Sequence, residues 1–89
     1  MIENINFTYK DGLLSPGDIT VYALSTCGHC KRALKFLDDN SVKYKFVYVD
    51  LLSSEEKNNI KDYLAKKSNM YVAFPFLVID DATFFTGFI

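Results

Sequence analysis

The stretch Ile19-Thr20-Val21-Tyr22-Ala23-Leu24-Ser25-Thr26-Cys27-Gly28-His29-Cys30 decides the fold of this chain. Its first half is rich in β-branched and aromatic residues, which favour a strand over residues 19–24. The two hydroxyl residues before the first cysteine are typical of a helix start. Apolar side chains at offsets of three and four then predict an amphipathic helix over 28–39, whose buried stripe is Cys30, Ala33, Leu34 and Leu37.

The residues after this helix continue the alternation of strands and helices. Residues 42–49 alternate lysine with apolar residues, which predicts a half-exposed strand. Ser53-Ser54-Glu55-Glu56 then supplies a serine cap and first-turn glutamates that oppose the helix dipole. We expect the helix that begins there to end near Lys67.

The last part of the chain predicts a hairpin. Residues 76–79 are wholly apolar, Asp80-Asp81 turns the chain, and residues 83–85 form a short strand. The order β-α-β-α-β-β predicts an α/β fold with a four-stranded mixed sheet. Alternating strand and helix implies a right-handed βαβ unit with parallel strands, whereas the tight turn makes the last two strands antiparallel.

Two segments complete the organisation of the chain. Residues 1–18 are a leader in which residues 5–9 alternate apolar and polar β-formers and could add an extra strand. Residues 19–89 form the main domain. We expect a core of aromatic side chains, which includes Phe36, Phe46 and Phe76. A second aromatic group either joins this core or forms an exposed docking patch, and consists of Phe84, Phe85 and Phe88.

Composition and charge exclude several classes of function. Ten basic and eleven acidic residues leave a net charge of −1, so we expect neither nucleic acid nor a membrane as partner. The apolar runs at 71–74 and 76–79 are far shorter than the ~20 residues that span a bilayer. The start Met1-Ile2-Glu3-Asn4 lacks the cationic and apolar segments of a secretory signal. We therefore expect a cytoplasmic protein. We also expect it to be a monomer.

Cys27 and Cys30 are the two cysteines of the sequence. A disulfide across so short a loop removes little entropy from the unfolded chain, so the pair is a poor structural staple. At a strand–helix junction this spacing is typical of a redox dithiol. Unpaired N–H groups and the helix dipole would stabilise a Cys27 thiolate, the reactive form. Cys30, almost one turn later, would then resolve the mixed disulfide.

The residues between and around the cysteines modify this chemistry. Gly28 leaves the approach to Cys27 open. His29 either donates a hydrogen bond to the Cys27 thiolate, which would raise the reduction potential, or is a solvated loop residue. Residues 19–37 contain no acidic side chain, so the motif offers no carboxylate to accept the Cys30 proton. Solvent, the substrate or a lysine must accept it.

Phe74-Pro75-Phe76 is the second notable element. Because proline lacks an N–H donor, it belongs at the start or edge of a strand. From the residues alone a trans bond is favoured, since only ~5–6% of X–Pro bonds in folded proteins are cis.

Together, the dithiol at 27–30, the proline strand at 74–79 and Thr86-Gly87-Phe88 resemble the glutaredoxin family of thioredoxin-fold redoxins over about residues 19–88. The resemblance implies a thioredoxin-like fold, with the usual third helix absent or truncated. It also implies a cis Pro75 that faces the dithiol. The substrate-binding positions that it implies are Phe74, Pro75, Thr86 and Gly87.

The same resemblance implies a small thiol–disulfide oxidoreductase that reduces protein disulfides or glutathione mixed disulfides through Cys27 and Cys30. It implies no metal and no tightly bound cofactor, with glutathione as co-substrate. Leu24 stands where many glutathione-using members carry lysine, and Thr86-Gly87-Phe88 is similar to the Ser-Gly-Phe of NrdH-type redoxins. That likeness adds thioredoxin reductase, as an alternative electron donor, and ribonucleotide reductase to the expected partners.

Two further interpretations stay open at this point. Cys27 of two chains could hold an iron–sulfur cluster in a dimer, which would make the protein a cluster carrier. The pair could also be a passive disulfide in a non-catalytic binding module.

Overall fold

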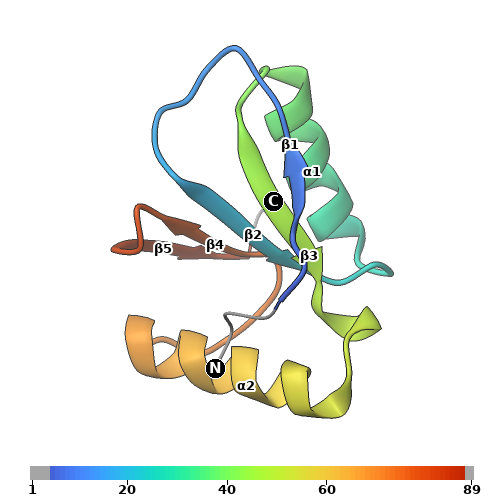
Figure 1. The fold of residues 1–89 in the computed structure, drawn as a ribbon, viewed down its shortest axis with the longest axis vertical. Helices are drawn as coiled ribbons and strands as arrows, with labels where there is room; N and C mark the ends of the chain where they lie inside the picture. The colour runs from blue at the N-terminus through green and yellow to red at the C-terminus, as the bar shows by residue number, and fades with distance from the viewer. Residues whose placement is uncertain (1–4, 88–89) are drawn as a thin grey trace.

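The strand expected over residues 19–24 is the centre of the sheet in the structure, a computed structural model that describes residues 5–87 (Figure 1). The elements in chain order are β1 (Thr8–Lys10), β2 (Ile19–Ala23), α1 (Gly28–Asp39), β3 (Tyr44–Tyr48), the short 3-10 helix η1 (Val49–Leu51), α2 (Ser54–Ser68), β4 (Phe76–Ile79) and β5 (Thr83–Thr86). The strand order across the sheet is β1-β3-β2-β4-β5. The described residues contain two α-helices, and no third α-helix follows β5 before residue 87.

Strand pairing confirms the expected topology and adds one strand to it. β2 pairs parallel with β3 and antiparallel with β4, and β4 pairs antiparallel with β5. β1 pairs antiparallel with β3, with Thr8 opposite Phe46, so the sheet has five strands rather than four. The extra strand starts at Thr8 and not at residue 5, and Ile5 instead packs among the core side chains before the strand begins.

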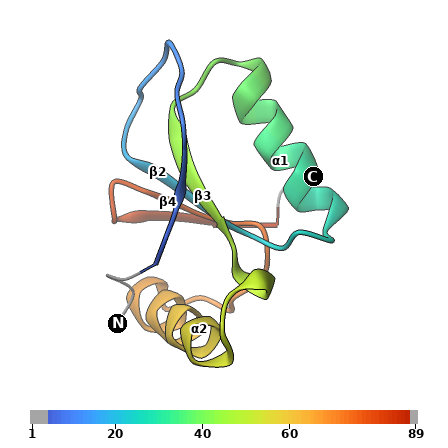
Figure 2. The same cartoon turned by 45° about the vertical axis from the view of Figure 1, so that its right-hand side comes forward.

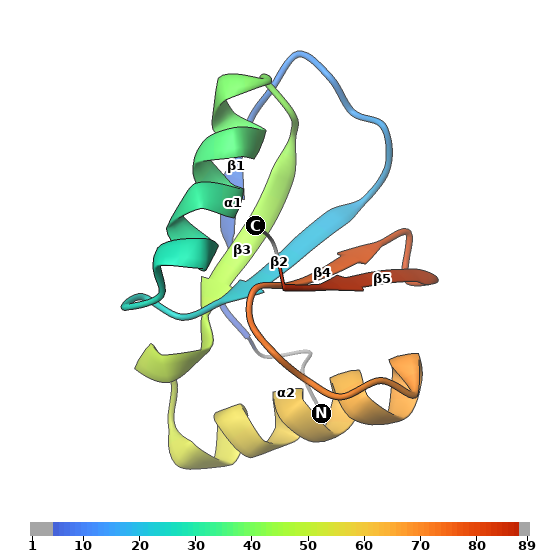
Figure 3. The ribbon, with the colours of Figure 1, turned by 180° about the vertical axis from the view of Figure 1, so that it is seen from behind.

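The two helices cover opposite faces of the sheet (Figures 2 and 3). Side chains of a strand point alternately to its two faces, so β2 contributes to two separate cores. On the α2 side, Tyr22 packs with Ile60 and Leu64. On the α1 side, Val21 and Ala23 pack with the expected stripe of the helix, in which Cys30, Ala33, Leu34 and Leu37 are all buried.

The aromatic side chains follow the expectation only in part. Phe76 is fully buried and Phe46 is half-buried. Phe36 is 52% exposed, contrary to expectation, because it lies outside the narrow stripe that α1 buries. In the second group, Phe84 is half-buried with its ring 6.3 Å from that of Phe76, while Phe85 is 54% exposed. Phe88 lies outside the described residues.

Candidate functional site

Cys27 lies at the first turn of α1, as its sequence position predicted. The chain leaves β2 at Ala23 and turns sharply, with the N–H of Cys27 bonded to the carbonyl of Leu24 at 3.2 Å. Cys27 is the N-cap of the helix, and its Sγ accepts the N–H of Cys30 at 3.3 Å. The residue is half-buried. Its sulfur therefore takes the place that a serine or aspartate oxygen takes in an ordinary cap.

Cys30 lies one turn further along α1 and is fully buried. Its Sγ accepts the N–H of Leu24 at 3.4 Å, and both cysteines are free thiols. Burial raises the pKa of Cys30 to about 11. The pKa of Cys27 is lowered, first by a hydrogen bond from the Cys30 side chain and next by the Cys30 N–H. The geometry therefore makes Cys27 the more acidic thiol and Cys30 the thiol that holds its proton more tightly.

The two residues between the cysteines are exposed. A side chain added at Gly28 would meet only Arg32, at 3.7 Å, so the approach to Cys27 is open on this side. The ring of His29 turns to Arg32, whose Nη2 lies 2.6 Å from Nδ1. Because a guanidinium can only donate, Nδ1 accepts this bond. The groups near Cys27 that favour its thiolate, and so lower its pKa, include the main-chain N–H of His29 and the charge of Arg32.

The proline segment reaches the same edge of the sheet as the dithiol. The peptide bond between Phe74 and Pro75 is cis, as the resemblance implied. Tyr22 of β2 pairs with Phe76 of β4, so Pro75 lies beside the point where β2 ends and the chain turns toward Cys27. The side chains of Cys27 and Phe74 both pack against the core cluster that contains Cys30.

The end of β5 is attached to the proline segment by two hydrogen bonds. Thr86 Oγ1 donates to the carbonyl of Ala73 at 3.0 Å, and the N–H of Gly87 donates to the carbonyl of Pro75 at 3.1 Å. The four positions expected to bind substrate are thus brought together. The roles of these four residues stay predictions.

Sequence reasoning missed Asp50, a carboxylate from outside the motif that binds Ser25, two residues before Cys27. It lies in η1, directly after β3, and accepts the N–H of Ser25 at 2.8 Å and its hydroxyl at 2.5 Å. Parallel neighbouring strands bring their carboxyl ends to the same edge of a sheet. An acidic residue just after the second strand of the βαβ unit was therefore the signal that could have identified it.

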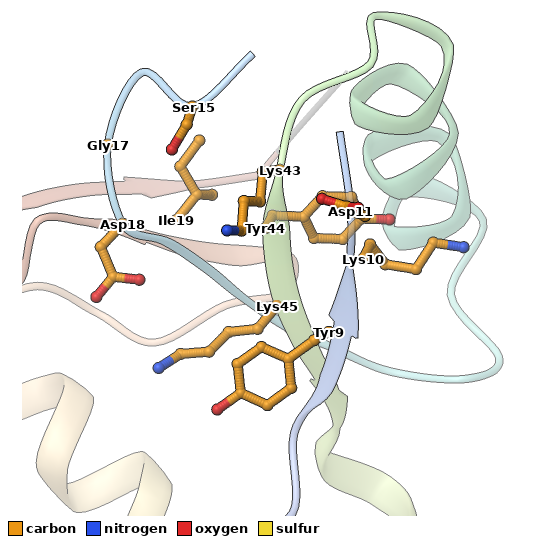
Figure 4. Close-up of a pocket in the computed structure, with 10 residues that line it drawn as sticks. All are labelled: Tyr9, Lys10, Asp11, Ser15, Gly17, Asp18, Ile19, Lys43, Tyr44 and Lys45. Atoms are coloured by element: carbon orange, nitrogen blue, oxygen red, sulfur yellow. The ribbon is translucent and has the colours of Figure 1, made fainter. Parts of the chain in front are cut away.

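Two of the concave surfaces formed by the described residues are larger than 400 Å³. A cavity of about 420 Å³ lies between the N-terminal segment and strands β2 and β3. Among the lining residues drawn in Figure 4, Tyr9 and Lys45 extend beside each other. Its lining mixes lysines with carboxylates and includes no residue of the dithiol or the proline segment. A more open groove of about 720 Å³ runs along α2 and residues 70–74, and reaches Phe74.

Metal sites and membrane spans are absent from the part of the chain that the structure describes. Within residues 5–87, no three His, Cys, Asp or Glu side chains lie together so that they could hold a metal ion. An iron–sulfur cluster would therefore need sulfur from a second chain or from glutathione. Neither helix of the described residues is long and apolar enough to cross a bilayer.

Comparison with known proteins gives matches to one family. The model of the glutaredoxin family matches residues 19–84. Human glutaredoxin-1 is 33% identical over 52 residues, which are 57% of this chain and 49% of the human protein. The chain thus spans about half the length of this relative.

Solved structures extend the likeness to nearly the whole chain. The glutaredoxin from Methanosarcina mazei Go1 superposes with a TM-score of 0.79 and 31% identity, over 93% of this chain and 79% of that one. The methanoredoxin of Methanosarcina acetivorans gives a TM-score of 0.79 and 33% identity, over 92% of this chain and 85% of that one.

Proposed function

Because the chain belongs to the glutaredoxin family, we propose that it is a small thiol–disulfide oxidoreductase that reduces protein disulfides or glutathione mixed disulfides. The observation that carries the proposal is the asymmetry of the two sulfurs. Cys27 is a half-buried helix cap that accepts the N–H of Cys30, whereas Cys30 is fully buried behind it. One sulfur is therefore suited to attack and the other to resolve.

The proposed reaction transfers two electrons from the dithiol to the substrate. The Cys27 thiolate attacks one sulfur of the target disulfide, which breaks the target S–S bond and releases a thiolate that takes a proton from solvent. Cys30 then gives its proton to solvent or to the departing substrate sulfur and attacks Sγ of Cys27. The bond between Cys27 and the substrate breaks, the second substrate thiol leaves, and a Cys27–Cys30 disulfide remains. Two molecules of glutathione, or a thioredoxin reductase, would return the pair to the dithiol.

We propose that the substrate lies along the wall formed by Phe74, Pro75, Thr86 and Gly87. An extended peptide segment can pair with main-chain groups there as an added strand would. Leu24, three residues before Cys27, is half-buried and apolar, so this position offers no cation to a glutathione carboxylate. That substitution supports a protein disulfide as substrate and a reductase as electron donor.

The use of two cysteines in one motif supports a cytoplasmic location, where thiols stay reduced.

Two coupled assays test the proposal with the same protein sample. One supplies NADPH, thioredoxin reductase and a protein disulfide, and the other supplies NADPH, glutathione, glutathione reductase and a glutathione mixed disulfide. We expect turnover in at least one, with none for Cys27→Ser. No turnover of the intact chain in either assay would overturn the proposal. Iron bound in stoichiometric amount to an anaerobically prepared dimer would instead favour the cluster carrier.

A further inference from the structure

Ser25 and Asp50 form a contact that the exchange chemistry described above does not use. Both oxygens of the Asp50 carboxylate are occupied, one by the N–H of Ser25 at 2.8 Å and the other by its hydroxyl at 2.5 Å. Both groups are half-buried. Hydrogen bonds to an ionised acceptor are shorter and stronger than neutral ones, and two on one residue fix its orientation.

The contact lies in the middle of the turn that presents the dithiol. Leu24, on one side of Ser25, donates its N–H to Sγ of Cys30 at 3.4 Å and accepts the N–H of Cys27 at 3.2 Å. Cys27 follows two residues after Ser25. Ser25, the residue that Asp50 holds, therefore directly follows the residue whose N–H and carbonyl bond to the two cysteines.

We propose that Asp50 is a positioning residue of the dithiol, which fixes the Cys27 turn through Ser25 and places a constant negative charge near Cys30. The effect of Asp50 on disulfide exchange rests on the proposed function. Its effect on the position of the turn and on the charge near Cys30 is independent of that function.

The charges around the two sulfurs support this assignment. The hydroxyl of Ser25 is the main cause that holds the pKa of Asp50 below its ordinary value, and Lys57 of α2 acts in the same direction. The carboxylate is thus ionised wherever a thiol titrates, so it acts as a fixed charge and not as a proton acceptor. Asp50 adds to the effect of burial and of Cys27 in raising the pKa of Cys30, whereas Arg32 of α1 favours the thiolate of Cys27. The charges therefore favour the state in which Cys30 carries the proton and Cys27 is the thiolate.

Three variants separate the charge from the hydrogen bonds. Asp50→Asn keeps an acceptor for the N–H of Ser25 and a donor for its hydroxyl oxygen, but removes the charge. Ser25→Ala keeps the charge and removes the hydroxyl bond, and Ser25→Thr restores the hydroxyl. Asp39→Asn is the matched control, because it removes one exposed carboxylate at the opposite end of α1.

The first measurement is the titration of each cysteine in the reduced full chain, followed by its ¹³Cβ chemical shift. We expect Cys30 to titrate at lower pH in Asp50→Asn, and at the wild-type pH in Asp39→Asn. At pH 9 the fraction of Cys30 thiolate should rise roughly two- to sixfold, as expected for one charge acting through a partly solvated path. Unchanged titration in Asp50→Asn, or an equal change in Asp39→Asn, would overturn the role of the charge.

The second measurement is the rate at which Cys27 reacts with a neutral alkylating reagent. Ser25→Ala should slow it roughly three- to tenfold, because the turn loses one charge-assisted hydrogen bond, and Ser25→Thr should recover most of the rate. Equal rates for the wild type, Ser25→Ala and Ser25→Thr would show that Ser25 does not place Cys27. Neither measurement requires a substrate. A chain that fails both coupled assays but shows these effects would refute the proposed function and leave this inference standing.

Discussion

The N–H of Cys30 donates a 3.3 Å hydrogen bond to Sγ of Cys27, so the second cysteine stabilises the thiolate of the first while it keeps its own proton. A main-chain donor is present whatever the protonation of the Cys30 side chain. Burial of that side chain holds its proton in place, and the two pKa values move in opposite directions. A difference in acidity between two chemically identical groups is what an attack followed by a resolving step requires.

Serine variants of the two cysteines should therefore behave differently. Cys27→Ser should abolish turnover, because the hydroxyl that replaces the thiolate is not ionised. Cys30→Ser should still attack, but it should accumulate a mixed disulfide with a protein substrate. Mass spectrometry of the unreduced reaction mixture measures the adduct. Wild-type turnover of a protein disulfide by Cys30→Ser would show that Cys30 does not resolve the intermediate.

The stability of the reduced protein should depend on pH in two opposite phases. The pKa of Cys27 is lowered in the folded chain relative to an ordinary thiol. The free energy of unfolding should therefore rise with pH until the thiol of the unfolded chain has titrated, at about pH 8.5. The pKa of Cys30 is raised to about 11, so stability should fall between about pH 8.5 and pH 11. Urea unfolding at a series of pH values measures both phases.

Each serine variant is the control for one phase of this profile. Cys27→Ser should lose the rise below about pH 8.5, and Cys30→Ser should lessen the fall above it. If the wild-type chain and both variants gave the same dependence of unfolding free energy on pH, the opposite pKa shifts of the two thiols would be contradicted.

His29 should act through its main chain more than through its ring. Its N–H favours the Cys27 thiolate, whereas its ring accepts a bond from Arg32. His29→Pro removes the N–H and should lower the reduction potential, because it destabilises the reduced form. His29→Ala keeps the N–H and should leave the potential closer to the wild-type value. Equilibration with glutathione buffers measures both, and equal shifts in the two variants would assign the effect to the ring.

Some of the features that the sequence predicted are encoded within one element. The stripe of α1 has its residues within eight positions of one another, and it is buried as expected. The serine cap of α2 is also present, since Ser53 accepts the N–H of Glu56 at 3.1 Å. Such signals need no knowledge of what packs against the helix.

The features that were missed or misplaced depend on neighbours distant in sequence. Asp50 meets Ser25 only because β2 and β3 pair in parallel, and the two residues are twenty-five positions apart. Ile5, expected in the extra strand, lies before β1 and is buried among core side chains that include Ile60 of α2. Phe36 is exposed because only one stripe of α1 faces the sheet. The predicted stripe already left Phe36 out, so the expectation of a buried Phe36 followed its hydrophobicity and not its position on the helix.

Thr86 should affect substrate binding more than the chemical step. Its Oγ1 donates to the carbonyl of Ala73 at 3.0 Å and so holds the proline segment against the end of β5. Thr86→Val removes one hydrogen bond at constant shape, worth about 0.5–1.5 kcal/mol, and should raise KM roughly two- to tenfold with little change in kcat. Thr86→Ser should retain the wild-type KM. A fall in kcat at unchanged KM would place Thr86 in the chemical step instead.

Two glycines near the site should respond to alanine with opposite signs. Gly28 is the first residue of α1, and an added Cβ would meet only Arg32 Nη1 at 3.7 Å, so Gly28→Ala should raise the free energy of unfolding by about 0.4–1 kcal/mol. Gly87 has a φ of 75° with nothing within 4 Å of an added Cβ. Gly87→Ala should therefore cost about 1–2 kcal/mol through the backbone alone. Urea unfolding of the two variants measures both changes, and a shared sign would show that backbone conformation at Gly87 does not govern its response.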